Sequence, residues 1–539
     1  MKALWRSGDP FVWLAGAMLA LSLLMVAGLV LLILVNGLGL FWPRDLERFT
    51  LDGGSIVVGE VSAREVIPNP GASLETPVRY RIQVKRGDRD VFGSDFVWID
   101  EANIVRRERP DDLVALERRE WGNFFGAISA VRQGTRTVAT GPEAAWRALE
   151  ARLPEVQRLH EQIHSIEKQE IGANNYAVER LRLARRGLEL RGVTSGPEVD
   201  EIADRIAALY EQYGASMKRL EQLREAQNTT LVAMTGDGRT LEIPFDKLVR
   251  AYRPNRMGTL EKAGFYLAKI WEFVSTDPRE SNTEGGVFPA IFGTVMMVLI
   301  MSVLVTPLGV VAALYLREYA RQGPFVSAVR IAVNNLAGVP SIVFGVFGVG
   351  FFIYTIGGTI DRWFFAEALP TPTFGTGGIL WASLTLALLT VPVVIVATEE
   401  GLAAVPRGVR EASIALAATK FETTWRVVLP AVLPSILTGL ILAMARAAGE
   451  VAPLMITGVV KLAPALPLDG FFPFFHLERK FMHLGFHIYD VGFQSPNVDA
   501  ARPMVYMTTV LLLAIVLLLN LAAITIRNRL RKRFQFAAV

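Results

Sequence analysis

Two ionisable residues inside an apolar stretch are the first candidates for chemistry in this sequence. Arg446 and Glu450 lie in the segment ARAAGEVAP, within the apolar range Ala431–Thr457. On a helix this spacing places both side chains on one face, with Arg446 more than half-way along the stretch. Ionisable groups this far inside a membrane span face a transport pathway or a partner. We therefore expect the pair to meet a transported ion, with a purely structural ion pair as the alternative.

A second polar feature interrupts another apolar range, Ile331–Ile356, in the stretch NNLAGVPSIVFGVFG. Asn334 and Asn335 need hydrogen-bond partners in hydrocarbon, and Pro340 leaves a helix carbonyl without its donor. Together with Ser341, these residues are candidates for the substrate pathway. Glycines in the same stretch permit close helix contact, so a kinked packing helix is the alternative.

The loop Glu399–Pro430 separates two apolar ranges and has some thirty residues. Pro406 begins one helix-like segment and Leu429-Pro430 closes another. Its basic residues place it in the cytoplasm: Arg407, Arg410, Lys420 and Arg426. We expect two short helices that another protein grips, with a hairpin packed on its own membrane domain as the alternative.

The same loop resembles the signature of ABC-importer permeases, E-A-A, three residues, G, nine residues, I-x-L-P. The matching residues are Glu411, Ala412, Ser413, Ala417, Val427, Leu429 and Pro430. Ser413 stands for the second alanine and Ala417 for the glycine. Both are small, so close docking of an ATPase is preserved, but a backbone with positive φ at Ala417 is not expected.

The elements that must position these residues are membrane spans. The chain has 539 residues, 51% of them hydrophobic, and a mean hydropathy of +0.34. Net charge is +4, which reflects the basic ends of membrane spans and gives no reason to expect nucleic-acid binding. There is no cysteine, so disulfides, thiolate metal sites and cysteine nucleophiles are excluded.

Six apolar ranges are long enough to cross a bilayer as helices. They are 11–40, 287–316, 331–356, 379–397, 431–457 and 504–526. With the N-terminus inside, Lys and Arg concentrate on the segments that then face the cytoplasm, including the basic C-terminal end. The first span is expected to remain uncleaved, since no small-residue cleavage site follows it.

The range 44–286 has a different composition and is expected outside the cytoplasm. Strand-like runs at 55–61, 78–84 and 96–99 precede a long helical stretch. We predict a helical hairpin or coiled coil at about 143–227, then a β-hairpin at 230–243 turning at Gly236-Asp237-Gly238. The expected architecture is an all-α polytopic membrane protein with an inserted extracytoplasmic α+β domain whose task is contact.

The predicted domains follow from these ranges. Residues 1–43 form the N-terminal tail and first transmembrane helix, and 44–286 the outer domain. Residues 287–530 form the membrane domain with five more helices and the loop 399–430, followed by a cytoplasmic tail at 531–539.

Four stretches together resemble the PstA-type permeases of bacterial phosphate-specific ABC importers. They are GLGLFWP at the end of the first span, GVPSIVFG, TEEGLAAVPRGVREAS and ARAAGEVAP. The outer domain resembles only enlarged forms of these permeases, and its role does not carry over. The resemblance implies an inner-membrane protein of type I importer architecture, with both termini cytoplasmic.

The resemblance also implies partners. These are a PstC-like permease subunit, two cytoplasmic ATPase subunits and a periplasmic phosphate-binding protein. The chain would not be an enzyme, and it lacks the G-x-x-x-x-G-K-[ST] phosphate loop. Neither a metal nor another cofactor is predicted. Arg446 would attract the phosphate, with Glu450 holding its geometry.

Other functions remain open from the residues alone. Sulfate or molybdate could replace phosphate as the tetrahedral oxyanion. A signalling receptor with an outer sensory domain would need a cytoplasmic output domain. A zinc site is a further alternative, because His483 and His487 lie four apart near His476, Glu478 and Asp490, although no HExxH glutamate accompanies them.

Overall fold

The computed structural model describes residues 9–68, 78–279, 282, 284–495 and 498–535 of the chain. It divides into two compact units. The membrane unit comprises Met1–Leu40, Val287–Phe365 and Thr371–Val539. The outer unit comprises Phe41–Gly286 together with the short segment Ala366–Pro370.

Six helices among the described residues are long and apolar enough to cross a membrane, which confirms the predicted number. They are Phe11–Leu38, Phe288–Tyr319, Ser341–Phe364, Ile379–Ala404, Lys420–Gly449 and Ala501–Lys532. Within an α-helix every backbone N–H and C=O is paired inside the segment, so apolar side chains can face lipid at little cost. The fold is therefore that of a polytopic helical membrane protein.

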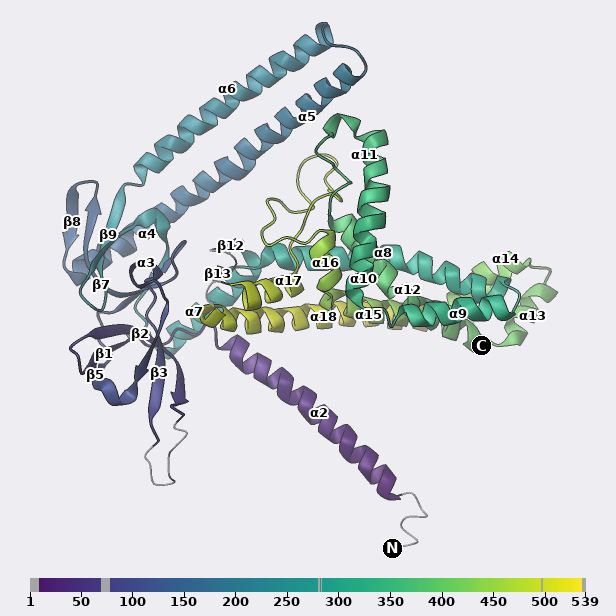
Figure 1. Ribbon diagram of the computed structural model, residues 1–539, viewed down its shortest axis with the longest axis horizontal. Helices are drawn as coiled ribbons and strands as arrows, with labels where there is room; N and C mark the ends of the chain where they lie inside the picture. Colours follow the sequence, from purple (N-terminus) through teal and green to yellow (C-terminus); the bar gives the residue numbers. More distant parts are fainter. Residues whose placement is uncertain (1–8, 69–77, 280–281, 283, 496–497, 536–539) are drawn as a thin grey trace. The chain divides into compact units, whose positions relative to one another are not determined.

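The membrane unit also contains shorter pieces, labelled in Figure 1 where there is room. Its helices are α2 (Asp9–Leu38), α8 (Phe288–Leu314), α9 (Pro324–Leu336), α10 (Ser341–Phe347), α11 (Gly358–Phe364), α12 (Ile379–Ala404), α13 (Arg407–Ala415), α14 (Lys420–Thr423), α15 (Leu429–Gly449), α16 (Ala452–Thr457), α17 (Leu484–Tyr489) and α18 (Val498–Gln535). Wider π turns extend or join several of them: η5 (Tyr315–Tyr319), η6 (Gly348–Gly357), η8 (Thr424–Val428) and η9 (Asp490–Gln494).

Two predicted spans are wrong in their limits. The third was expected at 331–356, but α9 ends at Leu336 and α10 begins at Ser341, with Pro340 between them in a non-helical conformation (φ −54°, ψ 135°). Proline fixes φ and disfavours a helical residue before it, so the helix stops there. The fifth was expected to continue to Thr457, but α15 ends at Gly449.

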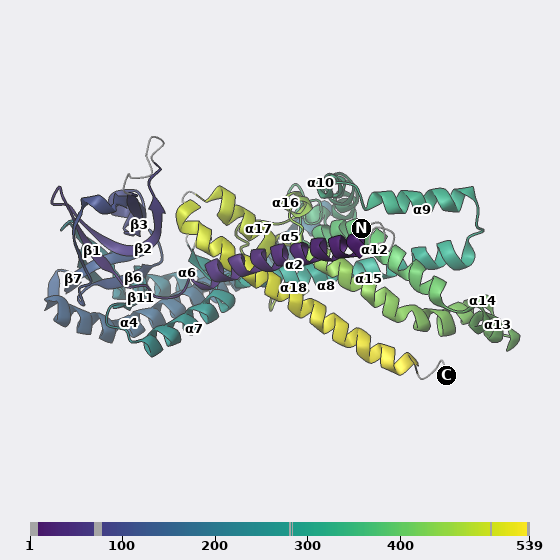
Figure 2. The same cartoon turned by 90° about the horizontal axis from the view of Figure 1, so that it is seen from below.

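The centre of the membrane unit is a close packing of α8, α12 and α15, seen side by side in Figures 1 and 2. Small residues allow this approach. A Cβ placed on Gly439 of α15 would lie 2.6 Å from Ala397 Cβ of α12, and one on Gly309 of α8 would lie 2.6 Å from Val394. Glycine at helix contacts lets the two backbones approach closely. The resulting van der Waals packing holds the helices together in lipid, where the hydrophobic effect does not act between them.

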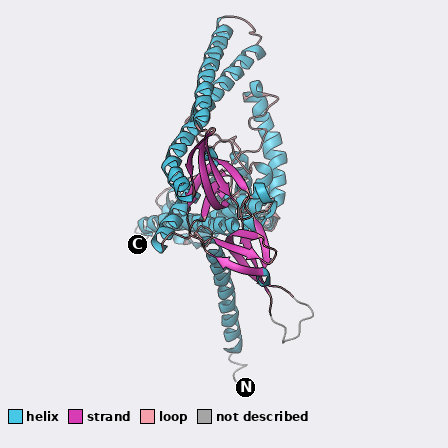
Figure 3. Cartoon of the chain, turned by 90° about the vertical axis from the view of Figure 1, so that its left-hand side faces the viewer, coloured by secondary structure: helices cyan, strands magenta, loops and turns pink. Residues whose placement is uncertain are grey.

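The outer unit contains two larger antiparallel sheets, whose strands are drawn in magenta in Figure 3. The first has the order β4-β3-β2-β1-β5 and the second β10-β9-β7-β6-β11, with β8 paired to β7. The strands are β1 (Glu47–Leu51), β2 (Ile56–Val66), β3 (Tyr80–Lys85), β4 (Phe96–Asp100), β5 (Ile104–Glu108), β6 (Val114–Arg118), β7 (Phe124–Gln133), β8 (Arg136–Thr140), β9 (Thr229–Met234), β10 (Thr240–Pro244) and β11 (Leu248–Tyr252). The predicted β-hairpin is confirmed as β9 and β10.

Long helices extend from the sheets of the outer unit (Figure 3). A continuous helical run consists of α4 (Pro142–Ser165), the π turn η2 (Ile166–Ile171) and α5 (Gly172–Leu190), and α6 (Pro197–Ala226) returns beside it. Ile163, Ile166 and Leu220 form a buried contact between the two arms. Two further elements complete the unit before the chain re-enters the membrane unit: α7 (Thr259–Ser275) and the small ladder of β12 (Pro278–Arg279) with β13 (Glu284–Gly285).

Candidate functional site

The signature loop contains one separate short helix, α13, which ends in a tight turn. The N–H of Ala417 donates to the carbonyl of Ile414 at 2.9 Å, and the N–H of Ala418 donates to that of Ser413 at 3.3 Å. This pair of bonds is the Schellman pattern, which requires a left-handed residue. Ala417 adopts it with a φ of 62°. The expectation of no positive φ at this position was therefore wrong: the capping bonds override the side chain's preference.

The second half of the loop is not a separate hairpin helix. The side chain of Thr419 accepts from the N–H of Glu422 at 3.2 Å, and the carboxylate of Glu422 accepts from the N–H of Thr419 at 2.9 Å. This capping box begins α14, which continues through η8 into α15 and carries Leu429 and Pro430 at its first α-helical turn. The loop is thus a helix, a turn and the extended start of a span.

Arg410 fixes α13 to the membrane unit. Its guanidinium donates to Glu318 of η5 at 2.8 Å and to the carbonyls of Val405 and Leu402 at 2.7 and 2.8 Å. A second pair, Arg330 with Glu399 at 3.1 Å, holds the end of α12 in the same way. The position of the loop is therefore set by charged contacts inside the chain.

The other side of α13 is unoccupied by the chain itself. Glu411 and Ala412 are exposed, and among the described residues the carboxylate of Glu411 has no hydrogen-bond or ion-pair partner. Ser413 is half-buried, with its hydroxyl 2.9 Å from that of Thr423. Apolar side chains that the sequence reasoning missed are exposed nearby: Ile414, Leu416, Phe421 and Trp425.

These four apolar residues, the loop patch from here on, had a signal in the sequence. The rings of Phe421 and Trp425 stack with centroids 6.2 Å apart, one helical turn from each other. Aromatic residues in a polar loop between two spans are typical of contact surfaces. An exposed apolar patch beside an unpaired carboxylate is suited to docking a partner.

Arg446 and Glu450 do lie together, although not on one helix. Arg446 is in the last turn of α15, and Glu450 follows as the extended residue that ends it. Arg446 Nε and Glu450 Oε1 are 3.6 Å apart, and the two side chains are 36% and 20% exposed. No other hydrogen bond or ion pair of Arg446 is present among the described residues. Most guanidinium donors are therefore available to another group.

The other pathway candidates have separate places. Asn334 and Asn335 are exposed in the last turn of α9, before the break at Pro340, rather than inside a span as expected. Ser341 is the first residue of α10 and half-buried. Within the described part of the chain, none of these three forms a hydrogen bond with Arg446.

The two motifs that contain these candidates nevertheless meet. A Cβ on Gly345 of α10 would lie 2.7 Å from Pro453 of α16, and one on Gly348 would lie 2.4 Å from Thr385 of α12. The GVPSIVFG stretch therefore packs directly against the segment that follows Glu450. Replacing Gly345 by a larger residue would push against the backbone beside the charged pair.

Comparison with known proteins bears on what this arrangement is. Residues 305–535 match the family described as "Binding-protein-dependent transport system inner membrane component". A probable ABC transporter permease protein of Bacillus subtilis (strain 168), YqgI, is 30% identical over 258 residues, which are 47% of this chain and 81% of that protein. The chain belongs to this family of ABC transporter permeases.

The predicted resemblance to PstA-type permeases is confirmed by further relatives. The phosphate transport system permease protein PstA of Mycobacterium leprae (strain TN) is 38% identical over 196 residues, which are 36% of this permease and 59% of that protein. The protein of that name from Yersinia pestis is 37% identical over 187 residues, 35% of this permease and 57% of that protein. The permease thus spans between half and two thirds of these relatives' length.

A solved structure gives a weaker likeness. One inward-facing form of the MetNI methionine ABC transporter aligns with a TM-score of 0.33 and 18% identity, covering 49% of this permease and 98% of that chain. That score is too low to carry an argument.

The three histidines considered above as zinc ligands lie in the connection between α16 and α18. Both ring nitrogens of His476 face carboxylates, Glu478 at 3.1 Å and Asp469 at 3.0 Å. His483 is fully buried, accepts from the N–H of Gly485 and begins α17, and burial lowers its pKa to about 3. Asp490 pairs with Lys461 at 3.0 Å. Over the described part of the chain, no group of three or more His, Cys, Asp or Glu residues is placed to hold a metal ion.

Proposed function

We propose that this permease moves inorganic phosphate into the cytoplasm as one subunit of an ABC importer. The observation that carries the proposal is the loosely paired guanidinium of Arg446, held at the end of an apolar span with most donors uncommitted. A guanidinium stays charged in a protein and offers several donors to a tetrahedral oxyanion. The names of the PstA relatives support phosphate as that anion.

In this proposal Glu450 acts as the competitor of the substrate. An anion in a low-dielectric passage needs a compensating charge, because its transfer from water is otherwise prohibitive. Arg446 supplies the charge, and the carboxylate 3.6 Å away takes the guanidinium back when the anion leaves. A pair with good bidentate geometry would resist this exchange, whereas a loose pair permits it.

Energy for transport would enter at the signature loop. We expect a cytoplasmic ATPase to contact Glu411 and the loop patch, while Arg410 transmits the movement to η5 and α8 through Glu318. Two ATPase subunits, a second permease subunit of PstC type and a phosphate-binding protein complete the proposed importer. Alternating access would then follow from rigid movement of the spans.

The proposed location is the inner membrane, with both termini and the loop 399–430 in the cytoplasm and the outer unit on the other side. The chain has no cysteine, so single cysteines can report each side. We expect Arg180→Cys to react with an impermeant thiol reagent in spheroplasts, and Arg407→Cys, an exposed position of the loop outside the loop patch, to react only after lysis. The reverse pattern would refute this orientation.

Substrate is tested by uptake into proteoliposomes. The permease is purified with the subunits that co-elute and reconstituted with the binding protein and internal ATP, and entry of radioactive phosphate is measured. We expect ATP-dependent entry that excess sulfate or molybdate does not reduce. Transport of sulfate or molybdate in preference to phosphate would contradict the proposal and leave an importer of another oxyanion.

A further inference from the structure

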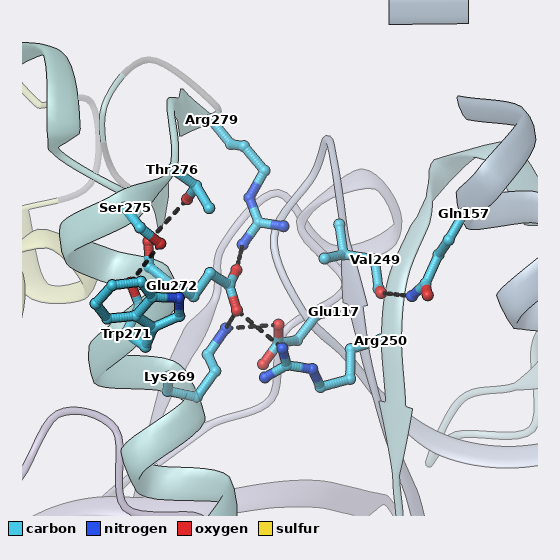
Figure 4. Close-up of polar contacts among 10 residues, drawn as sticks. All are labelled: Glu117, Gln157, Val249, Arg250, Lys269, Trp271, Glu272, Ser275, Thr276 and Arg279. Atoms are coloured by element: carbon cyan, nitrogen blue, oxygen red, sulfur yellow. Dashed lines mark hydrogen bonds and ion pairs between the residues drawn. The ribbon is translucent and has the colours of Figure 1, made fainter. Parts of the chain in front are cut away.

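Helix α7 of the outer unit has two unlike faces. On one face, Lys269 and Glu272 belong to a network of charged residues on the strands and the following segment (Figure 4). Lys269 donates to Glu117 of β6 at 2.8 Å and to Glu272 at 3.1 Å, and Glu272 also accepts from Arg250 at 3.0 Å and Arg279 at 2.9 Å. These contacts fix the rotation of the helix about its axis.

Aromatic residues reinforce the same face. Phe273 is 1% exposed, and Phe265 lies against Tyr252 of β11 with ring centroids 4.6 Å apart. The guanidinium of Arg250 lies 5.2 Å from the Phe265 ring centroid. Burying these groups turns the opposite face of α7 away from the domain.

That opposite face is apolar and uncovered. Leu260, Leu267 and Trp271 are 90%, 66% and 71% exposed. At about 100° per residue they fall, together with exposed Gly264, on one narrow stripe. Exposed apolar residues scattered singly need no explanation, but a stripe on a rigidly held helix marks a surface that another phase or molecule covers.

The connections between the outer unit and the membrane spans show how near, along the chain, α7 lies to the bilayer. The span Phe11–Leu38 ends three residues before Phe41, whose ring lies 5.3 Å from that of Phe273. The next residue, Trp42, lies with its ring 6.0 Å from that of Tyr266. The first connection from the membrane therefore arrives on α7.

The second connection leaves from the same helix. Two residues after α7, the carbonyl of Asp277 accepts from the N–H of Gly286 at 3.1 Å, next to the antiparallel pairing of β12 with β13. The next span begins two residues later, at Phe288. At no more than ~3.6 Å per residue, the end of α7 lies within roughly 20 Å of the point where the chain enters the bilayer.

We infer that α7 lies in the interfacial layer of the bilayer on the side of the outer unit, with Leu260, Leu267 and Trp271 inserted among the lipid headgroups. Tryptophan and leucine on one face with charges on the other are typical of helices that lie in a membrane surface. Trp42 and Trp271 would act as interfacial anchors. The helix would thereby hold the outer unit at a set height and rotation. This role is independent of the transported substrate.

The test uses the absence of native cysteines. Leu267→Cys and, separately, Trp271→Cys are labelled with a small environment-sensitive fluorophore in the full permease, co-purified with its partner subunits and held in phosphatidylcholine–phosphatidylglycerol nanodiscs. Leu190→Cys, an exposed leucine at the end of α5 (54% exposed), is the matched control. We expect nitroxide-bearing lipids to quench both α7 probes several-fold more than the control, and aqueous iodide to quench mainly the control.

Two other results would overturn the inference. Equal quenching of all three probes by iodide, with no effect of the nitroxide lipids, would leave the stripe in water. Shielding of the α7 probes from both quenchers would show that a protein subunit covers the helix instead. Two positions on the stripe are probed. If the Leu267→Cys and Trp271→Cys probes are quenched differently, the stripe does not share one lipid environment, and that result also counts against the inference.

Discussion

The charged network of Lys269 and Glu272 on α7 and two charges of the membrane unit, Arg446 and Glu411, are arranged on opposite principles. Glu272 is met by Lys269, Arg250 and Arg279, all at 2.9–3.1 Å and all from within the outer unit. Arg446 has one carboxylate at 3.6 Å, and Glu411 has no partner among the described residues. A carboxylate with several internal cations serves the fold. A charge left loosely paired or unpaired is available for a ligand or another subunit.

The first prediction concerns Glu272, the carboxylate that is paired with three cations. Glu272→Gln should lower the local stability of α7 by about 3–5 kcal/mol, because three cations lose their partially buried counter-ion. Hydrogen exchange of the α7 amides in the purified chain measures this loss. Glu201→Gln on α6, whose carboxylate makes one exposed pair with Arg205 at 3.7 Å, is the control and should change little. Equal effects would contradict the structural role of the network.

Acid provides a second check on the same residue. Burial alone raises the pKa of Glu272, but the charges of Lys269, Arg279 and Arg250 outweigh it and hold the pKa below its ordinary value of 4.5. The stabilisation is therefore present above about pH 4.5 and is lost as the pH falls further through the lowered pKa. Exchange measured from pH 6 to 3 should show this loss in the native chain and not in Glu272→Gln.

A second comparison lies within α13. The carboxylate of Glu411 has no partner among the described residues, whereas its neighbour Arg410 is bonded to Glu318 of the membrane unit. Glu411→Lys should weaken association of the ATPase by roughly ten- to a hundredfold, since a charge-assisted contact worth ~1.5–3 kcal/mol is lost. Insertion and folding should be unaffected. Co-purification and titration with the ATPase measure the change.

Arg410 supplies the matched comparison. Arg410→Gln removes the contacts with Glu318 and two carbonyls, so it should first loosen the loop, seen as faster exchange of the α13 amides. Glu411→Lys should leave that exchange unchanged. If Glu411→Lys binds the ATPase normally, α13 serves only to pack on its own membrane unit.

The smallest expected effect concerns the turn after α13. Ala417→Gly should stabilise the loop by about 1 kcal/mol, because glycine adopts the observed φ of 62° without the clash of a Cβ. Ala412→Gly, inside the helix, should destabilise it by ~1 kcal/mol. Exchange rates in the two variants should move in opposite directions, and a shift in the same direction would contradict the capping geometry.

Much of the fold follows from the sequence because apolar length is a strong signal. Six spans, the strands at 56–66 and 80–85 and the β9–β10 hairpin are all visible in runs and alternation. The break before Ser341 was visible as Pro340, but hydropathy alone continued the span through it. The end of α15 at Gly449 had even less signal, because the residues on both sides are apolar.

The candidate site could be predicted only in part. Spacing suggested that Arg446 and Glu450 meet, and they do, although Glu450 lies beyond the helix end. The left-handed Ala417 depends on capping bonds that no single residue reveals. The α7 network joins Glu117 to Lys269, which are far apart in the sequence, and the sheet order that brings them together is a tertiary property.

We propose that Arg446 is loosely paired because it meets the transported anion. Phosphate uptake by the reconstituted importer tests it most directly, with Arg446→Gln, Arg446→Lys and Glu450→Gln compared at equal amounts of assembled complex. We expect no uptake with Arg446→Gln, partial uptake with Arg446→Lys, because lysine lacks the planar fork, and altered but measurable uptake with Glu450→Gln. An Arg446→Gln complex that assembles and transports phosphate at the native rate would contradict it.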